Sequence, residues 1–242
     1  MTEYLDDVIS PTSLVSTRVV LWDLDGTLTD SGPAITSAIQ QALVRCGLPP
    51  VSTSAARKCV GPPLLHGLPA YCGVSEERLA EVVAVYREIY QDIMCEAPLY
   101  PGVRETLEAC ADAGLCQAIA TAKPEGSARE ILAHHDLMAA FDVVTGADES
   151  EGRLTKDAVI ATCLDRLDEA GIREPREERF RICMIGDRFY DMEGAATYGL
   201  QAIFAAWGYG SAAEAGDFPP AGDLEEVAQL LGLTVRRDLT RA

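Results

Sequence analysis

Two aspartates, Asp23 and Asp25, stand two positions apart at the end of the apolar run 19–22. The run has the length and composition of a buried strand, and alternate residues of a strand point to the same side. Both carboxylates can therefore face one crevice beyond the strand end, where open parallel sheets bind their ligands. Because two acids held this close repel each other, the pattern predicts a hard divalent cation such as Mg²⁺.

Gly26 and Thr27 follow the two aspartates directly. Glycine permits a tight turn, and a threonine hydroxyl can cap the segment that comes next. We expect this turn to lie against a bound substrate. On its own, the Asp-x-Asp-Gly-Thr segment is also compatible with an ordinary exit from a strand.

A second strand end carries a hydroxyl group. Residues 115–121 form a mostly apolar run that ends at Thr121, and Ala122 and a helical pattern over 125–134 follow it. Capping of this helix is the simpler role for Thr121, because threonine is common at such turns.

Lys156 is the third candidate, and it opens a stretch of helical periodicity over 156–170. The helix macrodipole disfavours a cation at this end, so a nearby anionic group would account for its placement. Lys123 is an alternative source of the same charge.

A fourth segment places Asp187 and Asp191 after an apolar strand at 181–185. Asp187 stands directly beyond the strand, which favours it as a metal ligand. Asp191 lies in the first turn of the helical pattern that follows. Its carboxylate could orient Lys156 or a metal-bound water. The alternative role is stabilisation of the helix dipole.

Taken in order, the Asp-x-Asp, Thr, Lys and Gly-Asp-x-x-x-Asp signals resemble the haloacid dehalogenase superfamily of phosphotransferases, over most of the chain. The resemblance implies that Asp23 is the nucleophile and that Asp25 acts first as an acid and then as a base. It implies that Thr121 and a backbone N–H at Ala122 bind phosphoryl oxygens. Lys156 would neutralise the phosphate and the nucleophilic carboxylate.

The same resemblance implies a set of Mg²⁺ ligands. They are the side chain of Asp23, the backbone carbonyl of Asp25 and the side chain of Asp187. Asp191 is expected to stand outside this set, where it would orient Lys156 or a metal-bound water.

Helical and strand-like patterns alternate from residue 104 onward, which predicts an α/β fold with a doubly wound parallel sheet. The resemblance implies the strand order 5-4-1-2-3, which brings Asp23 next to Asp187. The core is assigned to 14–32 and 98–235, and flexible tails to 1–13 and 236–242. Strands are expected over 18–23, 115–121, 141–145, 181–185 and 201–204, and helices over 104–113, 125–134, 156–170, 192–198 and 224–231.

The interval 33–97 is longer than a crossover between parallel strands needs, so it predicts an inserted helical module. One helix is expected from Pro33 and a second after Ser75, which can cap it. On the second helix, Tyr86 and Tyr90 share the apolar face and are expected to be core residues.

This insert resembles the small cap that closes over the site in one branch of the superfamily. Lys58, close to a rigid turn at Pro62 and Pro63, is then expected to reach the substrate. A solvated helix end is the alternative interpretation, because exposed lysines are common.

Composition restricts the partners. The formal net charge of −18 argues against a nucleic-acid polymer or an anionic membrane, whereas a small phosphate ester stays compatible because Mg²⁺ and Lys156 act locally. The eight cysteines contain no C-x-x-C pattern and indicate reduced core residues. With no signal peptide and no membrane-spanning run, the expected location is the cytoplasm. The sequence indicates no oligomeric state.

These expectations converge on a Mg²⁺-dependent phosphatase that hydrolyses a small phosphate monoester through an aspartyl-phosphate. The loop 207–211 is similar to loops of phosphoglycolate-phosphatase-like and nucleotidase-like members, which suggests phosphoglycolate or a nucleoside 5′-monophosphate as substrate. The alternatives are a sugar phosphomutase of the same superfamily and a noncatalytic phosphate-binding protein on a decayed enzyme fold. A signalling receiver is disfavoured, because its phosphoacceptor and its metal-binding acid pair lie on different strands.

Overall fold

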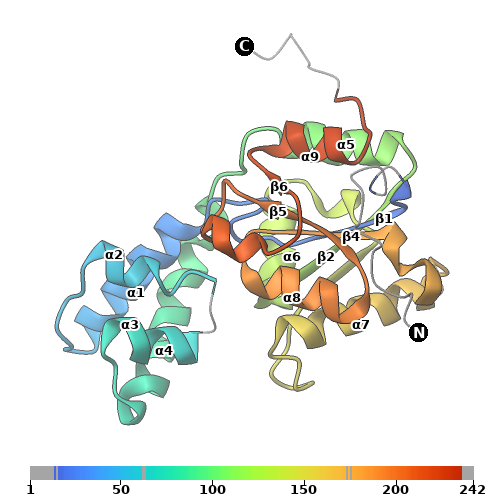
Figure 1. Ribbon diagram of the computed structural model, residues 1–242. Coiled ribbons are helices and arrows are strands. Elements are labelled where there is room, and N and C mark those ends of the chain that lie inside the picture. The colour runs from blue at the N-terminus through green and yellow to red at the C-terminus, as the bar shows by residue number, and fades with distance from the viewer. Residues whose placement is uncertain (1–13, 15, 62–63, 173, 175, 236–242) are drawn as a thin grey trace, which may run out of the picture.

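The computed structural model describes residues 14, 16–61, 64–172, 174 and 176–235 (Figure 1). The tails assigned to 1–13 and 236–242 lie outside the described residues, as does the turn expected at Pro62 and Pro63.

Six parallel strands form one sheet in the order β3-β2-β1-β4-β5-β6. Strands β1 to β5 therefore have the predicted order, which is 5-4-1-2-3 when the sheet is read toward β3. The strands are β1 (Val19–Trp22), β2 (Cys116–Pro124), β3 (Val143–Ala147), β4 (Ile182–Gly186), β5 (Gln201–Ala205) and β6 (Pro220–Ala221). Strand β6 was not predicted, because two residues, one of them a proline, carry no strand periodicity.

Alternation of side chains across β1 divides the interior into two clusters. Val20 and Trp22 belong to the larger cluster, whereas Val19 and Leu21 belong to the smaller one, and all four are buried. A strand buried on both faces is typical of a sheet covered by helices on both sides.

Helices cover both faces of this sheet (Figure 1). The two helices α7 (Lys156–Glu169) and α8 (Phe189–Tyr198) bury side chains in the smaller cluster. The larger cluster receives side chains from α5 (Val103–Asp112), α6 (Glu125–His134) and α9 (Leu224–Leu230). The α/β, doubly wound fold predicted from the sequence is therefore confirmed.

Predicted and observed elements differ at three places near the carboxyl edge of the sheet. Strand β3 spans Val143–Ala147, two residues later than the predicted range 141–145. Strand β2 continues past Thr121 to Pro124, and its pairing with β3 shifts register between Ala120 and Pro124. Helix α8 begins at Phe189, three residues before the predicted start. Thr121 and Lys123 therefore lie within β2, and Asp191 lies within α8.

The described residues of the insert between β1 and β2 form four helices, which lie to one side of the sheet (Figure 1). They are α1 (Gly32–Arg45), α2 (Thr53–Arg57), α3 (Leu64–Cys72) and α4 (Glu76–Ile93). Helix α4 buries Val82, Val83, Tyr86 and Tyr90, as its periodicity predicts. Ser75 occupies the N-cap position of α4, although its side chain makes no capping hydrogen bond. The assignment of 33–97 as a separate cap stays a prediction.

Short 3₁₀ turns complete the described secondary structure. They are η2 (Met94–Glu96), η3 (Met138–Ala140), η4 (Arg176–Arg181) and η5 (Ala212–Ala215).

Two expectations from composition can be compared with the structure. All eight cysteines are free; Cys59, Cys110, Cys163 and Cys183 are buried, and the other four are half-buried. The Sγ atoms of Cys59 and Cys72 lie 3.7 Å apart. Within the described ranges, no helix combines the length and the apolar character that crossing a membrane requires.

Candidate active site

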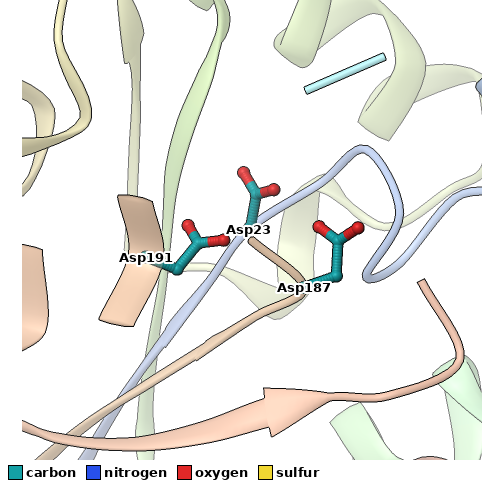
Figure 2. Close-up of side chains that lie close together, drawn as sticks. All are labelled: Asp23, Asp187 and Asp191. Carbon is teal, nitrogen blue, oxygen red and sulfur yellow. The ribbon is translucent and has the colours of Figure 1, made fainter. Parts of the chain in front are cut away.

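Three carboxylates meet at the carboxyl edge of the central strands. Figure 2 shows Asp23 after β1, Asp187 after β4 and Asp191 on α8, with their side chains close together. Each residue offers one ligand oxygen to a group whose members all lie within 4.8 Å of one another, and all three residues are buried. Strands β1 and β4 are neighbours in register, with Trp22 opposite Ile185, so Asp23 and Asp187 leave the sheet side by side.

Lys156 balances part of this negative charge. Its Nζ lies 2.8 Å from Asp23 Oδ1 and 2.5 Å from Asp191 Oδ1. Burial alone would lower the pKa of Lys156, but Asp191 and Asp23 more than offset it, so the pKa is raised and the side chain stays charged. The carboxylates are the anionic partners that account for a lysine at the first residue of α7.

Asp187 has one oxygen that no described residue satisfies. Its Oδ2 accepts a hydrogen bond from the backbone N–H of Tyr209 at 2.6 Å, while its buried Oδ1 has no hydrogen-bond partner in the described part of the chain. Burial, followed by the charges of Asp23 and Asp191, raises the pKa of Asp187 well above its usual range. An orphaned carboxylate oxygen beside two further carboxylates fits a hard cation that takes oxygen ligands.

Two glycines let the surrounding loops close onto Asp187. Gly26 has φ +85°, and a Cβ there would lie 2.4 Å from Asp187 Oδ2. A Cβ on Gly208 would lie 2.2 Å from Asp187 Cβ. Thr27, beside this turn, is fully buried, and its Oγ1 also lacks a partner among the described residues.

Asp25 lies apart from the three-carboxylate cluster and is paired with Lys123. Lys123 Nζ is 2.8 Å from Asp25 Oδ2 and 3.1 Å from Oδ1, and it also donates to the hydroxyl of Tyr90 at 2.8 Å. The two lysines that the sequence left as rivals therefore have separate partners, because Lys156 contacts Asp23.

Thr121 and Ala122 lie on the strand beside β1. Ile119 on β2 pairs with Trp22 on β1. Thr121 therefore lies at the same level of the sheet as the turn that carries Asp23 and Asp25. Thr121 is buried, and its Oγ1 accepts the backbone N–H of Lys123 at 3.2 Å, whereas Ala122 is exposed.

Lys58 is the C-cap residue of α2 and is exposed, with Nζ 5.8 Å from the centroid of the Tyr71 ring. No contact between Lys58 and the carboxylate cluster is present. The chain nevertheless reaches the core two residues later, where Val60 O accepts a hydrogen bond from Arg188 Nη1 at 2.5 Å. Arg188 directly follows Asp187, so the insert contacts the edge of the sheet that carries the site.

Sequence reasoning missed three polar contacts of the site. Tyr90 was expected only to fill the core, Arg188 was given no role, and Tyr209 was noted only as part of a loop. The flanking glycines Gly208 and Gly210 are the signal for Tyr209, because each packs against Asp187 where a Cβ would collide. Nothing in the sequence marks Tyr90 as a partner of Lys123.

The family follows from a comparison with known proteins. Residues 20–205 match the model of the haloacid dehalogenase-like hydrolases. The chain belongs to this family. The resemblance inferred from the strand-end motifs is therefore confirmed.

Several members of the family are similar over most of this chain. The tyrosine-protein kinase PtkA of Mycobacterium tuberculosis is 36% identical over 197 residues, which cover 81% of this chain and 65% of PtkA, so the chain spans less than two thirds of that relative. A 5′-nucleotidase of Pseudomonas aeruginosa is 33% identical over 216 residues, covering 88% of this chain and 94% of the nucleotidase. The crystal structure of a predicted phosphatase from Clostridium acetobutylicum superposes with a TM-score of 0.77 at 30% identity, covering 88% and 97% of the two chains.

Proposed function

We propose that this chain is a Mg²⁺-dependent phosphatase that hydrolyses a small phosphate monoester through an aspartyl-phosphate on Asp23. The observation that carries the proposal is the pairing of Lys156 Nζ with Asp23 Oδ1 at 2.8 Å beside the orphaned oxygen of Asp187. A nucleophilic carboxylate, a fixed cation and an incomplete oxygen ligand set are the parts that phosphoryl transfer requires.

In this proposal Asp23 attacks phosphorus with Oδ2, because Oδ1 is held by Lys156. Lys156 fixes the orientation of the carboxylate and stabilises charge on the transferring oxygens. Asp191 holds Lys156 in place through the 2.5 Å contact. Mg²⁺, held by Asp23, Asp187 and the backbone carbonyl of Asp25, would supply further neutralisation of the phosphoryl charge.

The remaining residues are assigned to the phosphoryl oxygens and the leaving group. Thr121 Oγ1 and the backbone N–H of Ala122 bind the phosphoryl oxygens. The N–H groups of Gly26 and Thr27 donate within their own turn, to Thr29 O at 2.8 Å and to Leu24 O at 3.3 Å. Asp25 protonates the departing alkoxide and then deprotonates the water that hydrolyses the intermediate, because donation of the proton leaves the base that the second step needs.

The substrate is proposed to be a phosphoglycolate-like ester or a nucleoside 5′-monophosphate, with Lys58 contacting its leaving group. The match to a protein named 5′-nucleotidase supports the second class. Because the relative PtkA is named a tyrosine-protein kinase, and because a phosphomutase would also use this site, the phosphoryl acceptor has to be tested directly. We assign water as the acceptor.

The test is release of inorganic phosphate from a panel of alkyl, nucleoside and aryl phosphates with Mg²⁺ and with a chelator. Asp23→Asn should abolish turnover, whereas Asp217→Asn, at an exposed site far along the chain, should leave it unchanged. In ¹⁸O-labelled water the released phosphate should carry the label, because water attacks the intermediate. A wild-type chain that hydrolyses no ester contradicts the proposal.

A further inference from the structure

A buried ammonium group joins Asp25 to the inserted helices. The Lys123 side chain is 3% exposed, and its Nζ contacts both oxygens of Asp25 and the hydroxyl of Tyr90. The same Nζ lies 4.7 Å from the centroid of the Tyr90 ring. Since an ammonium has three protons to donate, Asp25 and Tyr90 together account for its hydrogen-bonding capacity.

The tyrosine comes from the insert and the lysine from the sheet. Tyr90 lies on α4, whereas Lys123 lies on β2. Two other polar contacts between described residues of the insert and of the sheet-bearing part are more exposed. Arg87 on α4 pairs with Glu149 at the surface, and Val60 accepts from Arg188 in a partly buried position. The Tyr90–Lys123 contact is thus a buried connection that ends on the residue assigned to proton transfer.

We infer that Tyr90 is a positioning residue for Asp25, acting through Lys123, so that proton transfer to the leaving group depends on α4 lying against the sheet. The inference rests on the proposed phosphatase function. An ammonium that contacts both oxygens restricts rotation of the Asp25 carboxylate, and the Tyr90 hydroxyl fixes the ammonium in turn. Orientation of an acid toward the atom that it protonates is a condition for efficient transfer.

The choice of leaving group separates this role from a structural one. An alkyl phosphate releases an alkoxide that needs a proton as the ester bond to phosphorus breaks, whereas p-nitrophenol leaves as a stable anion. The ratio kcat/KM reports the steps up to release of the leaving group, before water attacks the intermediate. A misplaced Asp25 should therefore lower kcat/KM for the alkyl ester and spare kcat/KM for the aryl ester.

Tyr90→Phe is the first variant, because it removes the hydroxyl and keeps the ring that packs on Lys123. We expect kcat/KM to fall about 10-fold with an alkyl phosphate and to stay within about 2-fold with p-nitrophenyl phosphate. Tyr86→Phe is the matched control. It deletes a hydroxyl one turn earlier on α4 from a ring stacked on Tyr90 at 5.3 Å. Among the described residues, Lys123 Nζ donates to Asp25 and Tyr90 and makes no hydrogen bond to Tyr86.

A second pair of variants tests the contact of Lys123 with Asp25 and the packing of the insert against the sheet. Lys123→Met should lower kcat/KM for the alkyl ester about 100-fold, with a smaller loss for the aryl ester. Arg87→Gln breaks a surface contact between the insert and Glu149 and leaves the contacts of Asp25 in place. It should change kcat/KM by no more than about 2-fold for either ester.

The outcomes distinguish the inference from the proposed function. Equal losses with both esters in Tyr90→Phe, or no loss with the alkyl ester, overturn the inference while wild-type turnover upholds the function. The same preference for the aryl ester in Tyr86→Phe or Arg87→Gln also overturns it, because docking of the insert would then be sufficient. A wild-type chain that hydrolyses neither ester overturns the function and the inference together.

Discussion

The ammonium of Lys156 lies 2.8 Å from Asp23 Oδ1, although Lys156 is the first residue of α7, where the helix macrodipole disfavours a cation. The pair is buried, and the same ammonium lies 2.5 Å from Asp191. The position is therefore stabilised by two carboxylates and not by the helix. Removal of this cation leaves Asp23 and Asp191 without the ammonium that pairs with both of them.

Lys156→Met is expected to affect both stability and catalysis. We expect the free energy of unfolding to fall by about 3–5 kcal/mol, because breaking a buried ion pair leaves uncompensated charge. Phosphatase turnover should fall by at least about 100-fold, because the transition-state charge loses its partner. Urea denaturation and phosphate release measure the two effects. Lys58→Met, at an exposed site, should change the unfolding free energy by less than about 0.5 kcal/mol.

The pH dependence of stability should report the acid cluster in metal-free protein. Burial and the neighbouring acids raise the pKa of Asp187, and burial raises the pKa of Asp191 to about 6 despite the opposing effect of Lys156. The folded state therefore binds more protons than the unfolded state, so these groups stabilise the fold at low pH and that stability is lost as the pH rises through their raised pKa values. We expect the melting temperature of metal-free protein to fall from about pH 5 to about pH 7.

Mg²⁺ should reverse this loss, because a cation at the cluster favours the ionised carboxylates. The rise in melting temperature on addition of Mg²⁺ should grow with pH. Asp187→Asn should raise the stability of metal-free protein at pH 7 by about 1–2 kcal/mol and remove the response to Mg²⁺. A response of normal size in Asp187→Asn would show that the ion binds elsewhere.

Much of the site was predictable because parallel strands end at a common edge of the sheet. Asp23 and Asp187 each follow an apolar run, and the order of the strands makes those runs neighbours. Lys156 was recognisable because its position conflicts with the helix dipole. The local patterns place each residue at a strand end or a helix start, and the strand order that brings Asp23 next to Asp187 came from the family resemblance.

The role of Tyr90 could not be predicted, because it depends on how α4 packs against the sheet. Its helical spacing with Tyr86 indicates burial, and both tyrosines are buried. Periodicity does not indicate where a buried hydroxyl points, and the partner, Lys123, lies in a different part of the chain. The small strand β6 escaped prediction for a local reason, since its two residues are too few to form a pattern.

Gly26 and Gly114 both have a backbone conformation that favours glycine, but only Gly26 also packs against a residue of the site. Both have positive φ, +85° and +75°, but a Cβ on Gly26 meets Asp187 whereas a Cβ on Gly114 meets nothing within 4 Å. Gly114→Ala should cost about 1–2 kcal/mol of stability and keep its activity. Gly26→Ala should add a loss of turnover and a weaker response to Mg²⁺, because Asp187 has to shift. Equal activity in the two variants would contradict the steric argument.

Lys58→Ala tests whether the insert contacts the substrate. The side chain of Lys58 is exposed. In the loop that follows it, Val60 O accepts a hydrogen bond from Nη1 of Arg188, the residue that directly follows Asp187. Gly61 permits this contact, because a Cβ there would lie 2.1 Å from the same Nη1. If Lys58 binds the leaving group of an anionic ester, Lys58→Ala should raise KM about 10-fold and leave kcat within about 2-fold, because the contact is present in both the ground state and the transition state. Arg57→Ala, one residue earlier, is the control for a general loss of positive charge, and an equal rise of KM in both variants would argue for long-range attraction in place of direct contact.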